Sequence, residues 1–124
     1  MLGAASVTAF LGATDLARAR RFFETVLGLE VVSLDDFALV LKSANGVIRV
    51  TQVEQAAGAP YTVLGWDVPD IEGSVAGLTE RGVAFTRYPG MAQDEHGIWT
   101  APSGSRIAWF RDPDGNVLSI AQHP

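Results

Sequence analysis

Apolar and polar positions follow two periods along the first half of the chain, and the switches between them predict its elements. A period of two predicts a strand over Ser6–Gly12, and a period near 3.6 then predicts a helix with one apolar face. Thr14 or Asp15 suits the N-cap of this helix, and Gly28 suits a left-handed residue at its end. Three further strands are predicted over Leu29–Leu34, Phe37–Lys42 and Val47–Val53, with turns at Asp35-Asp36 and Ala44-Asn45-Gly46.

The same order of patterns begins again after the small, uncharged stretch Ala56–Pro60, which is typical of a linker. Asp70 suits the N-cap of a second helix, which ends at Gly82. The strands of this half are predicted over Tyr61–Val68, Val83–Arg87, Ile107–Arg111 and Val117–Ala121. Between the last two, Asp112-Pro113-Asp114-Gly115 matches a type I turn, in which Asp112 accepts backbone N–H bonds and Gly115 takes a positive φ.

The two halves match position by position, which indicates an internal repeat. Asp15 corresponds to Asp70 and Gly28 to Gly82, and Gln52 falls on Gln122. We therefore predict an α+β fold in one domain, 1–124. It consists of two tandem βαβββ modules, at about 6–54 and 61–122, joined by a linker at 55–60. Their strands should form a curved, cup-like mixed sheet with the helices on its outer face.

One stretch, Tyr88–Gly104, has no counterpart in the first half. Long loops in compact domains are often functional, so we expect this insertion to close the cup. It carries Glu95, His96 and Trp99. His96 is a candidate general acid or base, or a metal ligand beside Glu95; the alternative is an exposed loop residue. His123, next to the end of the chain, is interpreted as a tail residue.

The amino-acid composition excludes several classes of binding partner and chemistry. The net charge is −5 and Lys42 is the only lysine, which argues against nucleic-acid binding because neutralising phosphates takes clustered cations. No apolar run approaches the ~18 residues of a membrane span, and the N-terminus lacks the pattern of a leader. The absence of cysteine excludes thiolate chemistry. These features predict a cytoplasmic protein.

The duplicated module, the capping Asp before a helix that ends Leu27-Gly28, and the Asp112–Asn116 turn before the last strand together resemble the vicinal oxygen chelate superfamily. This superfamily includes glyoxalase I, extradiol dioxygenases, fosfomycin-resistance enzymes and bleomycin-resistance proteins. The resemblance covers about Val7 to Gln122 and implies the fold rather than one reaction.

The resemblance also implies where a metal would bind. Metal-binding members take ligands from the first and last strands of each module, and these positions fall here at Thr8, Arg49, Val63 and Ser119. None of the four is His, Glu or Asp, so we predict no metal and no other cofactor. A divalent metal stays the alternative, because a shift of the alignment by one residue would bring in Glu54 or Asp67.

Candidate ligand-binding residues follow from strand alternation and side-chain chemistry. If Thr8, Val63 and Ser119 face the cavity, then Phe10 and Asp67 do so too, whereas Trp66 faces the helices. Arg49 in an apolar cup needs an anion, either Asp67 or a group of the ligand, unless it points outward. Trp99 is a better candidate for the pocket than Trp109. The predicted ligand-binding set is Thr8, Phe10, Phe37, Arg49, Val63, Asp67, His96, Trp99 and Ser119.

The leading hypothesis is a metal-free protein that binds a small planar or hydrophobic molecule, in one version a drug-sequestering, bleomycin-resistance-like protein, and that forms a homodimer. The acidic charge favours a cationic ligand. The alternative is a glyoxalase-type lyase, isomerase or dioxygenase with a displaced or absent metal and His96 as the acid or base. A third possibility is a dimerising module with no ligand.

Overall fold

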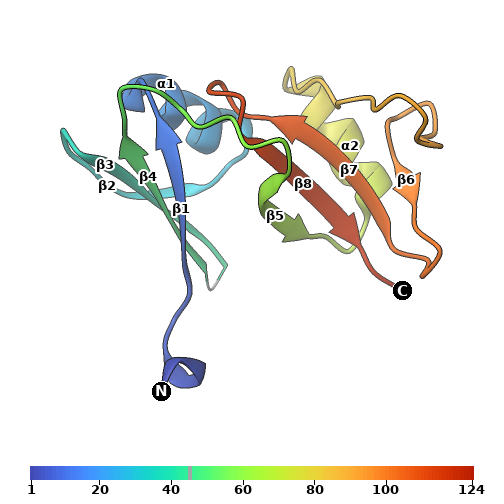
Figure 1. Cartoon of the computed structure of the whole chain (residues 1–124), viewed down its shortest axis with the longest axis horizontal. Coiled ribbons are helices and arrows are strands. Elements are labelled where there is room, and N and C mark those ends of the chain that lie inside the picture. The colour runs from blue at the N-terminus through green and yellow to red at the C-terminus, as the bar shows by residue number, and fades with distance from the viewer. Residues whose placement is uncertain (45) are drawn as a thin grey trace. The chain divides into compact units, whose positions relative to one another are not determined.

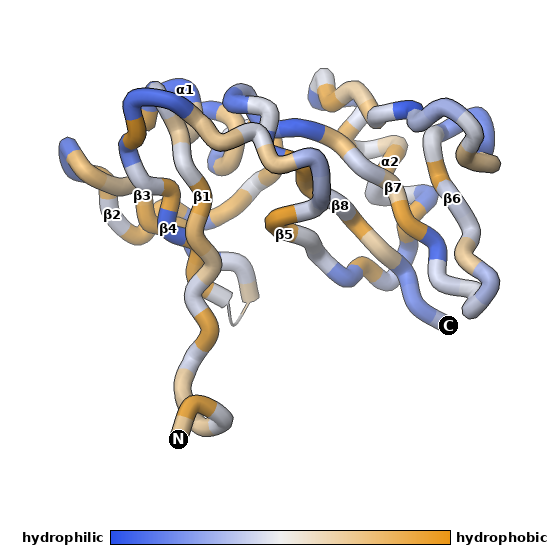
Figure 2. Tube along the Cα trace, in the orientation of Figure 1, coloured by the Kyte–Doolittle hydropathy of each residue, from blue (hydrophilic) through white to orange (hydrophobic). Residues whose placement is uncertain are grey.

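The computed structural model describes residues 1–44 and 46–124. They form two compact units, residues 1–57 and 58–124, which are described separately (Figure 1). Each unit has one four-stranded, mixed and open sheet. Much of the hydrophobic sequence lies in the strands (Figure 2). No helix in the described part of the chain has the length and apolar character needed to cross a membrane.

In the first unit, the sheet has the order β1-β4-β3-β2, with β1 and β4 parallel and the other pairs antiparallel. A short 3₁₀ turn, η1 (Leu2–Ala4), precedes it, and helix α1 continues into a π-helical segment, η2. The bounds are β1 (Thr8–Ala13), α1 (Leu16–Arg20), η2 (Arg21–Val26), β2 (Glu30–Leu34), β3 (Ala38–Ser43) and β4 (Gly46–Gln52). The turn predicted at Ala44-Asn45-Gly46 includes Asn45, which lies outside the described residues.

The second unit repeats this order. Its sheet runs β5-β8-β7-β6, again with the first pair parallel and the others antiparallel. The bounds are β5 (Thr62–Asp67), α2 (Ile71–Glu80), β6 (Trp99–Thr100), β7 (Arg106–Arg111) and β8 (Val117–Gln122). The predicted α+β class and the two βαβββ modules are therefore confirmed. The single domain and the cup-like curvature stay predictions.

Matching residues hold the helix starts in the two units. The Asp15 carboxylate accepts a hydrogen bond from the Arg18 N–H at 3.1 Å, and Asp70 accepts one from the Gly73 N–H at 3.2 Å. The last strand is tied to the same place by its glutamine: the Gln52 amide donates to the Thr14 carbonyl at 2.8 Å, and Gln122 accepts from the Ile71 N–H at 2.9 Å. The bonds accepted by Asp15, Asp70 and Gln122 satisfy N–H groups that a helix start leaves unpaired, and the Gln52 bond ties its strand to the residue before the cap.

One face of each sheet packs on its helix and forms the core. In the first unit this face carries Leu39, Leu41, Ile48 and Val50, which are buried along with Phe23 of η2. In the second unit it carries Ala108, Phe110, Leu118 and Ile120, buried along with Ile71 and Val75 of α2. The alternate residues of the same strands point to the opposite side, which we call the helix-free face of each sheet.

The strand predicted over Val83–Arg87 is wrong. The strand at this edge of the sheet is β6, and the segment before it makes one ladder-like bond, from the Thr86 N–H to the Trp109 carbonyl at 2.8 Å. The chain then leaves the edge at Tyr88 and returns at Trp99, which pairs with Ile107. The predicted insertion is thus a loop between two segments that both contact the edge of β7. The loop begins at the turn-forming Pro89-Gly90.

Candidate functional site

The helix-free face of the second sheet carries several of the predicted site residues. Trp109 is paired with Ser119, and Ser119 with Gly65. One pair further along, Ile107 lies between Trp99 and Ala121, and Ala121 is paired with Asp67. Directly paired residues of neighbouring strands point to the same side. Trp99, Trp109, Ser119 and Asp67 therefore share one face.

Trp66 points to the other side, as alternation predicts. Its ring stacks on that of Phe110, with centroids 6.5 Å apart and an interplanar angle of 14°. Phe110 is one of the buried residues of the helix side. Trp66 therefore belongs to the core, and the other two tryptophans belong to the helix-free face.

An aromatic cluster stands on this helix-free face. The Tyr88 ring meets that of Trp109 edge-on at 5.5 Å, and the Trp99 ring lies 6.2 Å from that of Trp109 at an angle of 38°. All three residues are half-buried, so part of each ring stays accessible. Trp99 was the tryptophan that the sequence favoured, and Trp109 joins it because β7 alternates. The cluster offers an aromatic surface on which a planar molecule can stack.

A chain of polar contacts lies on the same sheet. The Ser105 hydroxyl is 2.8 Å from Nδ1 of His123, and Nε2 of His123 is 3.1 Å from a carboxylate oxygen of Asp67. An ionised carboxylate only accepts hydrogen bonds, so in neutral His123 the proton sits on Nε2 and Nδ1 accepts from Ser105. The side chains of His123 and Asp67 are 55% and 81% exposed, so this base is reachable from solvent.

Sequence reasoning missed His123 by treating it as a tail residue. A signal was present, because counting in steps of two from Ser119 through Ala121 reaches His123 and places it on the face that carries Asp67.

Gly65 makes room for a neighbouring side chain on this face. A Cβ atom at Gly65 would lie 2.8 Å from the Ser119 hydroxyl and 3.3 Å from the Ser119 carbonyl oxygen. Gly65 thus leaves the space that the Ser119 side chain occupies. Val63 lies where the register between β5 and β8 shifts, between Thr62 and Leu64.

The first unit holds the other predicted ligand-binding residues, Thr8, Phe10, Phe37 and Arg49. Phe10 is paired with Arg49, so both lie on the helix-free face of that sheet. Phe10 and Phe37 are 65% and 74% exposed. Arg49 has a nearby anion within this unit: the pKa of Asp35 is lowered by backbone hydrogen bonds from Phe37 and Ala38 and further by the positive charge of Arg49.

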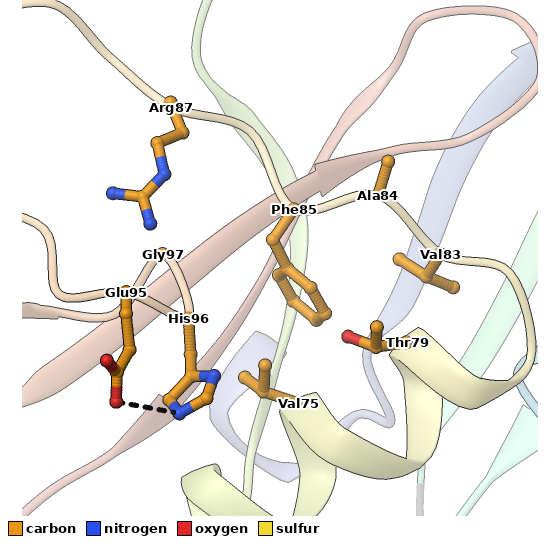
Figure 3. Close-up of a pocket in the computed structure, with 9 residues that line it drawn as sticks. All are labelled: Val75, Thr79, Val83, Ala84, Phe85, Arg87, Glu95, His96 and Gly97. Carbon is orange, nitrogen blue, oxygen red and sulfur yellow. Dashed lines mark ion pairs between the residues drawn. The ribbon is translucent and has the colours of Figure 1, made fainter.

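His96 lies apart from the face that carries Trp99, Ser119 and Asp67. It lines a pocket of 290 Å³ together with Val75 and Thr79 of α2, and therefore on the helix side of the second sheet (Figure 3). Its Nε2 is 3.4 Å from a Glu95 carboxylate oxygen. The structure thus keeps the predicted His96–Glu95 pair but separates it from the aromatic cluster.

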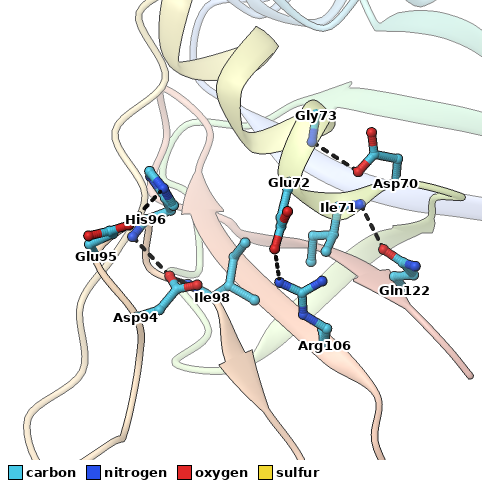
Figure 4. A network of polar contacts seen from close by, with 10 residues as sticks. All are labelled: Asp70, Ile71, Glu72, Gly73, Asp94, Glu95, His96, Ile98, Arg106 and Gln122. Atoms are coloured by element: carbon cyan, nitrogen blue, oxygen red, sulfur yellow. Dashed lines mark hydrogen bonds and ion pairs between the residues drawn. The ribbon is translucent and has the colours of Figure 1, made fainter.

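The loop that carries this pair is held by its own side chains. An oxygen of Asp94 accepts hydrogen bonds from the backbone N–H groups of His96 at 2.8 Å and Ile98 at 2.9 Å (Figure 4). Burial raises the pKa of Asp94, but these bonds outweigh burial and leave the pKa below its ordinary value. The Gln93 amide accepts from the Tyr88 N–H and donates to the carbonyls of Thr86 and Gly97.

Comparison with known proteins identifies the family. The model of the Glyoxalase/Bleomycin resistance protein/Dioxygenase superfamily matches residues 5–120. The chain belongs to this superfamily. The predicted resemblance is thereby confirmed. A comparison with curated proteins gave no match.

Solved structures of the superfamily share the fold over nearly the whole chain. A superfamily member from Sphaerobacter thermophilus DSM 20745 is 27% identical, with a TM-score of 0.74 over 99% of this chain and 100% of that one. TnmS3, an antibiotic-binding protein from Streptomyces sp. CB03234, is 21% identical, with a TM-score of 0.73 over 100% and 99% of the two chains. Lactoylglutathione lyase from Agrobacterium tumefaciens is 20% identical, with a TM-score of 0.69 over 96% and 93%.

The residues at the metal positions that the superfamily resemblance implied do not suit a divalent cation. Thr8 and Ser119 offer neutral hydroxyls, Val63 offers hydrocarbon, and the Arg49 guanidinium would repel the ion. Within residues 1–44 and 46–124, no group of three or more His, Cys, Asp or Glu side chains is placed to hold a metal ion. We therefore assign no step to a metal at these positions.

Proposed function

We propose that this protein binds a planar small molecule on the helix-free face of its second sheet, without a metal, and thereby sequesters it. The observation that carries the proposal is the aromatic cluster of Tyr88, Trp99 and Trp109. Stacking on accessible aromatic rings contributes ~0.5–1.5 kcal/mol per pair beyond the area buried. The fold is shared with an antibiotic-binding protein, which supports a drug-like compound as one version of the ligand.

Charge favours a cationic ligand on this face. The Asp67 carboxylate is exposed there, and the whole chain carries a net charge of −5. A cation can be stabilised both by Asp67 and by the faces of the tryptophan rings. The first unit's Thr8, Phe10, Phe37 and Arg49 stay predicted ligand-binding residues.

The proposal is tested with proflavine, a planar cation. Protein is titrated into a proflavine solution while the fluorescence of the proflavine is recorded. Trp109→Ala should weaken binding about tenfold, which corresponds to a loss of ~1.4 kcal/mol of binding free energy. Trp66→Phe is the matched control, since Trp66 lies on the helix side, and it should bind as the unaltered protein does. Equal affinity of the Trp109→Ala variant and the unaltered protein would contradict the proposal.

A second candidate function is a metal-free lyase or isomerase, which the contacts of His123 favour. As a general base, His123 would take up a proton at Nδ1, the nitrogen that accepts from the Ser105 hydroxyl, and the contact of Nε2 with Asp67 fixes this tautomer. The sequence pattern alone points to His96 as the base, but His96 lines the helix-side pocket. If this candidate is right, His123→Ala removes turnover and His96→Ala retains it; the opposite result would support His96.

A further inference from the structure

The helix-side pocket of the second unit is a separate concave site. It lies between α2 and the segment from Val83 to Gly97, on the opposite side of the sheet from Trp99 and Trp109. Its volume of 290 Å³ equals about ten water molecules at the ~30 Å³ that each occupies in the liquid. The space thus suits a compact molecule of roughly ten non-hydrogen atoms, at the small end of ligand pockets.

One side of the pocket is apolar and held in place. Val75 and Val83 are buried, and the Phe85 ring makes an edge-on contact with that of Phe110, with centroids 5.6 Å apart. Phe110 is itself in the core beneath α2. The pocket therefore offers an apolar wall that needs little rearrangement to receive a hydrophobic body, which keeps the entropy cost of binding small.

The other side carries one cation without a partner. Arg87 forms no hydrogen bond or ion pair with any residue that the structure describes. In Figure 3 its guanidinium points toward Gly97, whereas the Glu95 carboxylate turns toward His96.

The carboxylates near the pocket each have a contact of their own. Glu95 is 3.4 Å from Nε2 of His96, and Glu72 pairs with Arg106 at 2.6 Å. Asp94 accepts two backbone hydrogen bonds (Figure 4). Among the described residues that line the pocket, Arg87 is the cation with no contact of its own, and a guanidinium matches a carboxylate with two parallel hydrogen bonds.

We infer that this pocket binds a small aryl or alkyl carboxylate, with its apolar body against Val75 and Phe85 and its carboxylate at Arg87. This site differs from the aromatic cluster on the helix-free face both in position and in the charge of the ligand that it prefers. A protein that binds a planar cation on one side of its second sheet would then bind a small organic anion on the other.

Phenylacetate and its neutral isostere phenylacetamide test this inference, because the two probes differ in charge and hardly in shape. Titrations followed by two-dimensional amide NMR should shift the signals of Val75, Phe85 and Gly97. Phenylacetate should bind about tenfold more tightly than the amide, a difference of ~1.4 kcal/mol, because only the acid can pair its charge with Arg87. Equal affinities, or shifts confined to residues around Trp99 and Trp109, would overturn the inference.

Variants separate the charge from the cavity. Arg87→Gln should remove the tenfold preference for the acid and leave amide binding unchanged, whereas Arg111→Gln, on the helix-free face, should preserve the preference. Thr79→Trp, at an exposed helix position, should fill the pocket and weaken both ligands at least tenfold. A retained preference in a folded Arg87→Gln variant contradicts the inference. Trp109→Ala should leave phenylacetate binding unchanged. The proposal for this pocket can therefore be contradicted or supported independently of the proposal for the aromatic cluster.

Discussion

At the scale of single residues, alternation along strands accounts for most of what the sequence predicted of the site. Steps of two correctly separate Trp66 from Asp67 and place Ser119 on the helix-free face. The same rule also places Trp109 and His123 there, although other sequence features favour Trp99 over Trp109 and a tail position for His123. Partners could not be predicted in this way: that Arg49 influences Asp35, and that Asp67 meets His123, depends on how loops and chain ends fold back.

Gly65 offers a test of this close packing. Gly65→Ala should destabilise the protein by about 1 kcal/mol, because overpacking against Ser119 exceeds what alanine gains over glycine in a strand. The double variant Gly65→Ala/Ser119→Ala should recover most of that loss, since the hydroxyl contact at 2.8 Å is gone. Urea unfolding of these two variants and of Ser119→Ala alone measures this. Additive effects of the two substitutions would show that the hydroxyl is not what Gly65 makes room for.

At the scale of elements, the turn before β8 could be predicted from its residues, whereas the loop that separates Val83–Arg87 from β6 could not. The turn before β8 forms as the sequence indicates: Gly115 has a φ of +82°, and Asp112 accepts hydrogen bonds from the backbone N–H groups of Asp114 and Asn116. The edge at β6 depends instead on Gln93, which holds Thr86, Tyr88 and Gly97 together. Such contacts within a loop leave no periodic signal in the sequence.

The loop held by Asp94 should respond to acid. Because its pKa in the folded protein is below the ordinary value of 3.8, Asp94 contributes stability that is complete above that value and is lost as pH falls through the lowered pKa. Amide exchange of His96 and Ile98 should therefore speed up below about pH 4 relative to that of core amides.

The control for this effect is Asp94→Asn, which cannot titrate. Its amide protons at His96 and Ile98 should show no such acid-dependent change relative to the core. If the variant and the unaltered protein respond to acid in the same way, another group controls the loop.

At the scale of the whole molecule, the repeat of strand, helix and three strands was readable from the sequence because the caps and helix ends recur at matching places. Asp15 and Asp70 cap, and Gly28 and Gly82 both have a positive φ. The fold alone does not determine the function, because a lyase and an antibiotic-binding protein share it.

We also propose that the protein is a homodimer. Large hydrophobic residues are exposed on the first unit, among them Val7, Phe10 and Phe37, and burying them would favour association. Sedimentation velocity should give twice the mass of the chain, and Phe37→Ser should shift the protein toward the monomer. Tyr61→Ser, at an exposed aromatic residue of the second unit, is the control. A monomer at all concentrations up to about 100 μM would contradict this proposal.

The central claim is that a planar ligand stacks on the helix-free face of the second sheet, and the three tryptophans can report on it in one experiment. Each indole N–H gives a separate NMR signal, and a proflavine titration shows which of them the ligand approaches. We predict that the signals of Trp99 and Trp109 shift together with one affinity, while that of Trp66 stays in place. A shift of Trp66 alone, or of none of the three at saturating proflavine, would contradict the claim.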